Sequence, residues 1–341
     1  MSATRTTKKT TRGEAELQER DLAILQGLFE SRLMTLTHIT HLYFDGHGEA
    51  AKKRVQRLKE DRYVRERARR VYQPSILHLS RRAFATLSER GMLFEYPQFA
   101  WNQLEDRAKV SELTLKHELQ VLDVKTAFSC AIGSTPHYEL IEFSTWPLLY
   151  QFQAAQPAPP GTYQPARVLI KPDGFVRLHE KASDGDLFEH FLFLEVDRST
   201  EPRETLARRA FGYQDFYRRG GLAVRYGATR EAYKDFPFRV LMVFLTEERR
   251  NNMAERLLQN DPPVLTMVWL TTFSEVIADP LGAIWMRPLD YREITKGTLY
   301  DSSRPRTGAY RREPAREAMV VAELKKLRLF GEEQEITPNT M

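Results

Sequence analysis

Three acidic residues lie at the ends of two apolar segments in the middle of the chain. Asp173 stands within ARVLIKPDGFVRL, and Glu195 and Asp197 end the run LFEHFLFLEVD. The polar stretch HEKASDGD between the two segments predicts a hairpin connection, and opposite residues of an antiparallel pair have Cβ atoms about 5 Å apart. Converging carboxylates repel one another unless a cation lies between them, and hard cations prefer oxygen ligands. The sequence therefore predicts that Asp173 and Glu195 bind a divalent cation, Mg²⁺ or Mn²⁺.

A cation held in this way would act on a phosphodiester, because it polarises a phosphoryl oxygen and lowers the pKa of bound water. Lys171 and Arg198 flank the carboxylates and could bind the phosphodiester. Gln214 and Tyr217, on the helix predicted next, could support the site. A second interpretation makes the acids exposed strand ends that are balanced by nearby arginines, namely Arg177, Arg198 and Arg203.

The spacing of these acids resembles the PD-(D/E)xK motif of nucleases, in which two acidic residues bind Mg²⁺ and a lysine two positions later orients or activates water. Asp173 and Glu195 match the metal ligands, and Glu118 lies where many members of that superfamily place a further acidic residue. Asp197 stands where the motif has its lysine and would be a further ligand of the Mg²⁺ in an active enzyme. Lys171 or Arg198 could replace the missing lysine, or the metal alone would activate the water. The resemblance implies a nuclease-like site and leaves open whether the site cleaves DNA.

The elements that must position these residues follow from hydrophobic periodicity. A helix, a strand, an antiparallel pair of strands, a helix and buried parallel strands are expected in that order. The order is similar to a restriction-endonuclease-like fold, so the sequence predicts an α/β (α+β) domain at residues 111–295 with a mixed sheet flanked by helices. Residues 145–165 are Pro-rich and predicted as a loop, and residues 166–178 as a single strand.

The front of the chain has the order of a winged helix, namely three short helices and then a hairpin, at residues 19–91. Thr35 and Ser80 are expected to be helix N-caps, and Ala51, Val55 and Leu58 form a narrow apolar stripe on the third helix. That helix would enter the major groove of DNA while the hairpin contacts phosphates. An ordinary helical domain with a solvated basic face is the alternative. The predicted DNA-binding residues are Lys52, Lys53, Arg54 and Arg57 on the helix and Arg67, Arg69 and Arg70 at the hairpin tip.

Charge divides the chain in the same way. Residues 1–90 carry 19 Lys and Arg against 11 Asp and Glu, a net charge of +8, and because the whole chain of 341 residues has +5 the remainder sums to −3. This asymmetry indicates a nucleic-acid-binding module joined to a different kind of domain. The single cysteine, Cys130, excludes an intrachain disulfide and a Cys-rich zinc site.

The rest of the chain supplies the connections and the ends. Residues 1–18 are expected to be a disordered basic arm, residues 92–110 a linker anchored by Trp101, and residues 296–341 a helix and a tail. No apolar run is long enough to cross a membrane, and the basic start lacks the apolar core of a signal peptide. The expected location is therefore the cytoplasm.

Taken whole, the chain resembles the replication-relaxation family of plasmids and conjugative elements. The resemblance rests on the predicted winged helix, on KHELQVLDV and PDGFV, and on FLEVDRSTEP followed by a helix with FGYQDFY. It implies an accessory protein that binds double-stranded DNA during replication or mobilisation, working with replication, relaxase or other mobile-element proteins. The nuclease-like domain would then be degenerate and serve for homodimerisation or partner docking. An active Mg²⁺-dependent endonuclease and a transcriptional regulator are the alternatives.

Overall fold

The computed structural model describes residues 16–68, 72–107, 109–145, 150–155, 167–182, 184–199, 201–292 and 327–330. Arg69, Arg70, most of the expected N-terminal arm and most of residues 296–341 lie outside these described residues. The chain divides into two compact units, one up to Ser111 and one from Glu112 onwards. Across the described ranges, no helix combines the length and the apolar composition needed to cross a membrane.

The first unit is mainly helical and has a small antiparallel sheet with the strand order β1-β3-β2. The expected helices and the expected hairpin are present. A further strand of two residues, β1, pairs with β3 and is not indicated by the hydrophobic periodicity. Its elements are α1 (Glu19–Ser31), β1 (Met34–Thr35), α2 (Leu36–Tyr43), α3 (Gly48–Glu60), β2 (Val64–Glu66), β3 (Ile76–Leu79), α4 (Arg81–Glu89) and α5 (Trp101–Arg107).

Side-chain caps begin two of these helices at the expected residues. The Thr35 hydroxyl accepts a hydrogen bond from the His38 N–H at 3.2 Å, and the Ser80 hydroxyl accepts one from the Ala83 N–H at 3.1 Å. Each cap satisfies an N–H group that has no partner within its own helix. Both predicted N-caps are therefore confirmed, and so is the buried stripe of α3, which consists of Ala51, Val55 and Leu58.

The segment after α4 packs on the first unit through aromatic rings. Phe29 of α1 lies 5.5 Å from the Tyr96 ring and 5.8 Å from the Phe99 ring, and Phe84 of α4 lies 6.1 Å from Trp101. Aromatic pairs at these separations add to the free energy that burial supplies. Residues 92–107 therefore belong to the body of this unit, with Trp101 held against α4.

The second unit is an α/β domain built on a five-stranded mixed sheet, which confirms the predicted fold class. The strand order is β10-β9-β8-β7-β4, with β8, β9 and β10 parallel and β4, β7 and β8 antiparallel. Its elements are α6 (Glu112–Gly133), β4 (Tyr138–Thr145), β5 (Phe152–Ala155), β6 (Arg167–Ile170), β7 (Gly174–Lys181), β8 (Leu187–Asp197), α7 (Arg203–Arg218), α8 (Gly221–Arg225), η1 (Arg230–Asp235), β9 (Phe238–Phe244), α9 (Glu247–Leu258), β10 (Val268–Thr272) and α10 (Phe273–Ala278).

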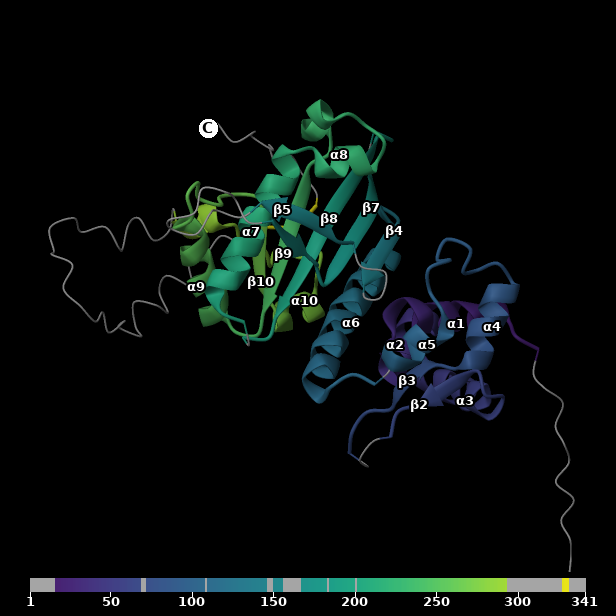
Figure 1. Ribbon diagram of the computed structural model, residues 1–341. Coiled ribbons are helices and arrows are strands. Elements are labelled where there is room, and N and C mark those ends of the chain that lie inside the picture. The colour runs from purple at the N-terminus through teal and green to yellow at the C-terminus, as the bar shows by residue number, and fades with distance from the viewer. Residues whose placement is uncertain are drawn as a thin grey trace, which may run out of the picture. The chain divides into compact units, whose positions relative to one another are not determined.

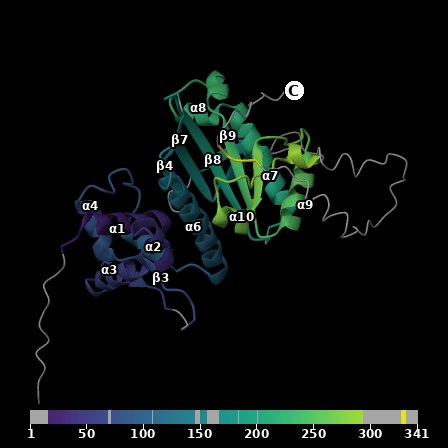
Figure 2. The ribbon, with the colours of Figure 1, turned by 180° about the vertical axis from the view of Figure 1, so that it is seen from behind.

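Helices cover both faces of this sheet (Figure 1). Alternate residues of β8 point to opposite faces, so Phe193 enters one core with residues of α7 and α9, whereas Leu192 and Leu194 enter a second core with residues of α6 and α10. The view from behind shows α6 running along its own face of the sheet (Figure 2). The strand ends of β7 and β8 are therefore within reach of helices on either side.

Two predictions for the middle of the chain are wrong. The Pro-rich stretch contains β5, and the segment expected as one strand forms β6 and β7 with a break at residues 171–173. Pro172 explains the break, because proline has no N–H to donate to a ladder. β6 pairs with β5 in a separate two-stranded sheet, while β7 joins the main sheet.

Candidate functional site

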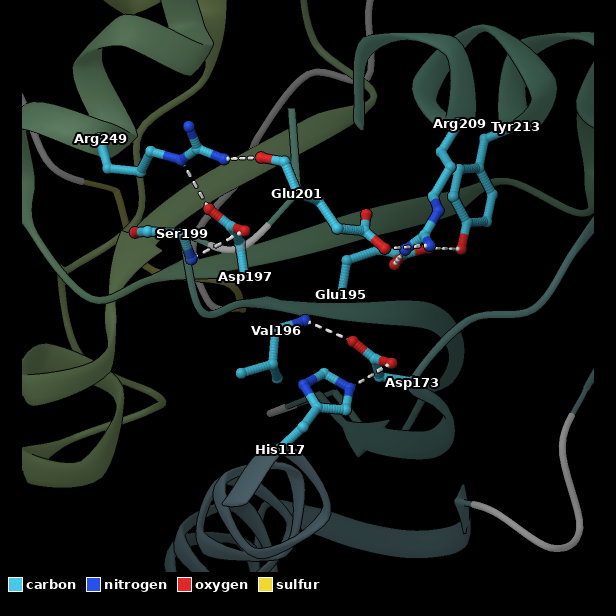
Figure 3. A network of polar contacts seen from close by, with 10 residues as sticks. All are labelled: His117, Asp173, Glu195, Val196, Asp197, Ser199, Glu201, Arg209, Tyr213 and Arg249. Carbon is cyan, nitrogen blue, oxygen red and sulfur yellow. Dashed lines mark hydrogen bonds and ion pairs between the residues drawn. The ribbon is translucent and has the colours of Figure 1, made fainter. Parts of the chain in front are cut away.

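The three acids identified in the sequence lie at one end of the main sheet. Gly174 pairs with Leu194 in the β7–β8 register, and the Asp173 N–H donates to the Leu194 carbonyl at 2.9 Å. Asp173 therefore lies just before β7, beside Glu195, and Asp197 is the last residue of β8. Each carboxylate nevertheless has its own partners, which come from different helices (Figure 3).

Asp173 is held between α6 and β8. Its Oδ1 lies 2.8 Å from His117 Nε2, and its Oδ2 accepts a hydrogen bond from the Val196 N–H at 2.7 Å. His117 comes from the second turn of α6 and remains partly exposed. Burial lowers the pKa of His117, but the hydrogen bond and the charge of Asp173, helped by Glu118 and Glu195, outweigh burial, so the pKa of His117 is raised overall.

Glu195 is buried against α7. Arg209 Nη1 donates to Oε2 at 2.8 Å, and the Tyr213 hydroxyl donates to Oε1 at 2.6 Å. Arg209 and Tyr213 are one helical turn apart, so they share the face of α7 that meets the sheet. Burial raises the pKa of Glu195 to about 7, since the opposing effects of Arg209 and Tyr213 are smaller and the Asp173 charge adds to the rise.

Asp197 and Glu201 complete a chain of ion pairs at the strand end. Arg249 of α9 donates through Nε to Asp197 Oδ2 at 2.7 Å, and the Ser199 N–H donates to Asp197 Oδ1 at 3.0 Å. Arg209 reaches Glu201 through its second nitrogen, Nη2, at 2.9 Å, and Arg249 donates to the Glu201 carbonyl. The strand end, the loop after it and two helices are thus tied together by two guanidinium groups.

This arrangement does not fit a divalent cation on the predicted ligands. All four carboxylate oxygens of Asp173 and Glu195 have hydrogen-bond partners from the protein, at 2.6–2.8 Å. In the described part of the chain, no group of three or more His, Cys, Asp or Glu side chains is arranged to hold a metal ion. The physical reason is that Arg209 already supplies the positive charge that would compensate buried Glu195.

Other residues suggested by the sequence have different surroundings. Lys171 is exposed, and Glu118 is half-buried and contributes its charge to His117. Gln214 is buried, and its side-chain oxygen lacks a hydrogen-bond partner among the described residues. The Tyr217 ring packs against Tyr233 and Phe238 and not at the carboxylates.

The arginines expected to balance the acids are not the ones that do so. Arg177 pairs with Glu189, and Arg198 donates to the Leu113 carbonyl. The sequence reasoning missed the residues that do contact the acids, namely His117, Arg209, Tyr213 and Arg249. Two signals were available: His117 stands beside Glu118 in KHELQVLDV, and Arg209 and Tyr213 are four residues apart on the helix that follows β8.

The side chains of the first unit that were predicted to bind DNA differ in their surroundings: the lysines are exposed, whereas the arginines that the structure describes have partners within the protein. Lys52 and Lys53 are exposed on α3. Arg54 instead pairs with the fully buried Asp21 of α1, with its Nε 2.6 Å from Asp21 Oδ1. Arg57 pairs with Asp61 at 3.1 Å, and Arg67 donates to the Val110 carbonyl at 3.0 Å.

Fold and site together define an α/β protein in which a small helical unit precedes a mixed sheet with paired acids at one end. A family model described as replication-relaxation matches residues 25–231, more than half of the chain. The chain belongs to the replication-relaxation family, which places it among proteins of replication and mobilisation. No curated protein and no solved structure matches it significantly. The matched range includes Asp173, Glu195, Asp197 and Arg209 but ends before Arg249.

Proposed function

We propose that this protein binds double-stranded DNA as an accessory factor of plasmid or mobile-element replication or mobilisation. The first unit acts as a winged helix, and the second is a nuclease-like domain that has become a binding or docking domain. The observation that carries the proposal is the exposed lysine pair of α3, Lys52 and Lys53, in a unit with the order α1-β1-α2-α3-β2-β3. Family membership supplies the replication context.

The charges of α3 support DNA binding through a small number of side chains. In a winged helix, the third helix enters the major groove, and cations on its exposed side meet phosphates and base edges. Arg54 is committed to Asp21, so its contribution is to hold α3 against α1. The helix surface that remains for DNA is the one around Lys52 and Lys53.

The architecture of the second unit supports a nuclease-like origin. A helix, three antiparallel strands, a helix and a parallel strand, here α6, β4, β7, β8, α7 and β9, form the core expected of a restriction-endonuclease-like domain. Asp197 occupies the position of the motif lysine and is bound to Arg249. We assign this unit to contacts with replication or relaxase proteins or with a second copy of the chain, inside the cytoplasm.

The test is duplex DNA binding by the full chain, measured by fluorescence anisotropy over a range of salt concentrations. Lys52→Ala/Lys53→Ala should weaken binding and reduce the slope of log K against log salt concentration by about 2, because each phosphate contact contributes about 0.9. The matched control is Lys181→Ala/Lys234→Ala, which removes two exposed lysines from the second unit.

Equal losses in the two double variants would show that binding follows net charge and not the α3 surface. Wild-type affinity and slope in Lys52→Ala/Lys53→Ala would refute the assignment of α3 as the DNA-contacting helix. Circular dichroism of each variant confirms that the fold is retained, which is expected because all four lysines are exposed.

A further inference from the structure

We infer that two arginines, and not a divalent cation, neutralise the strand-end carboxylates of the second unit. Arg209 and Arg249, together with Glu195, Asp197 and Glu201, form what we call the arginine clasp. The inference deepens the proposed function and rests on it only for the role given to this unit. The geometry of the clasp itself is independent of DNA binding.

The first observation is that guanidinium groups already contact the carboxylates that would have to bind a cation. A Mg²⁺ ion binds carboxylate oxygens at about 2.0–2.1 Å and demands a near-octahedral set of ligands. Glu195 is 2% exposed, and both its oxygens accept hydrogen bonds from α7, one from Arg209 and one from Tyr213. A metal ion at Glu195 would therefore compete with Arg209 and Tyr213 for these two oxygens.

The second observation is that the two guanidinium groups are linked through one residue. Arg209 spans Glu195 and the Glu201 carboxylate, while Arg249 spans Asp197 and the Glu201 carbonyl. The planar guanidinium group suits this role, because its several N–H donors point in fixed directions and can serve two acceptors at once. Figure 3 shows the resulting path from Glu195 through Glu201 to Asp197.

The third observation is the set of elements that the clasp joins. Glu195 and Asp197 come from β8, Glu201 from the loop after it, Arg209 from α7 and Arg249 from α9. A buried carboxylate without a partner would destabilise the fold strongly, so the clasp keeps the strand end stable with no bound ion. The unit can therefore hold its shape and dock partners in the absence of Mg²⁺ or Mn²⁺.

The decisive measurement uses the full wild-type chain, melted in chelator, in Mg²⁺ and in Mn²⁺ at constant ionic strength. A ligand that binds only the folded state raises the melting temperature by mass action. We expect equal melting temperatures in all three conditions, and no protein-bound Mn²⁺ signal by electron paramagnetic resonance.

Arg209→Gln tests the clasp by removing the guanidinium group that contacts Glu195. Arg208→Gln is its control, because Arg208 is the exposed neighbour on the same helix. Arg209→Gln should lower the melting temperature by several degrees and make it respond to Mg²⁺, since Glu195 then lacks its cation. Arg208→Gln should do neither. Glu195→Gln/Arg209→Gln should recover much of the loss, because no uncompensated charge stays buried.

A rise in the wild-type melting temperature with Mn²⁺ that disappears in Glu195→Gln would overturn the inference. If Arg209→Gln does not fold, the wild-type melts and the Glu195→Gln/Arg209→Gln variant still decide the question. Failure of DNA binding by the α3 surface would leave these results unchanged, so the two proposals can fail separately.

Discussion

Ionisable side chains of the second unit owe their charge states to the groups packed around them. His190 of β8 lies with its Nε2 2.7 Å from Glu180 Oε2 and its ring 4.8 Å from Phe330. Burial lowers the pKa of His190 below its ordinary 6.5, the charge of Arg239 lowers it further, and Glu180 opposes both. The pKa of His190 is therefore lower in the folded chain than in the unfolded chain.

This depressed pKa predicts how stability depends on pH. Below 6.5 the unfolded chain binds a proton at His190 more readily than the folded chain does, so protonation favours unfolding. The stability that His190 contributes to the folded chain is present at pH values above its pKa in the unfolded chain. This stability is lost as the pH falls through the lower pKa of His190 in the folded chain.

His190→Gln should therefore flatten the fall in melting temperature that accompanies acidification below pH 6.5. Differential scanning calorimetry of the full chain across this range is the measurement. The exposed His137 gives the control, His137→Gln, which should follow the wild-type curve. A wild-type acid response in His190→Gln would assign the effect to other groups.

At the scale of elements, α7 links the core to the arginine clasp. One side of the helix carries Leu206, Ala210 and Tyr213 into the core beside the sheet, and Arg209 reaches Glu195 from the same helix. Gly212 lets α7 approach β5 and β6, because a Cβ there would lie 3.0 Å from Ile170 and 3.1 Å from Ala154. The position of the clasp therefore depends on this close contact.

Gly212→Val should lower the free energy of unfolding by roughly 1–3 kcal/mol, the usual cost of forcing extra atoms into a packed interior. Urea denaturation followed by tryptophan fluorescence measures the change. Gly133→Val at the end of α6 is the matched control, since a Cβ built there meets no other part of the described chain within 4 Å beyond its own helix and neighbours. Equal effects of the two substitutions would mean that close packing at Gly212 does not limit stability.

At the scale of the whole molecule, the positive charge is concentrated towards the N-terminus. The net charge of +8 lies in residues 1–90, and the rest of the chain sums to −3. A cationic module attracts DNA phosphates, whereas the second unit satisfies its strand-end acids internally. DNA affinity and any hydrolysis are therefore expected to be separable properties.

Supercoiled plasmid incubated with the full chain and Mg²⁺ or Mn²⁺ should stay uncut, to the same extent as with Asp173→Ala. Gel electrophoresis of the plasmid is the readout. Asp197→Lys, which restores the motif lysine, should destabilise the protein and not create a nuclease, because the new ammonium group would face Arg249. Metal-dependent nicking by wild type that is absent in Asp173→Ala would instead favour the endonuclease alternative.

Local pattern alone determined much of the architecture. The N-caps Thr35 and Ser80 and the buried stripe of α3 were predictable because capping and helical periodicity act within a few residues. The placement of Asp173 and Glu195 at one strand end followed from strand alternation and a short connection. The sequence pattern did not predict β1 and β5, because the formation of such short strands depends on the strand that pairs with them.

Only the tertiary structure decided which cations the acids bind. Arg209 is 14 residues from Glu195, Arg249 is 52 from Asp197, and His117 is 56 from Asp173. The same holds for Arg54, which the sequence places among the DNA contacts and which pairs with Asp21, 33 residues away. Periodicity identifies the face on which a side chain lies. It does not identify the partner, because the partner is set by how separate helices pack around one sheet.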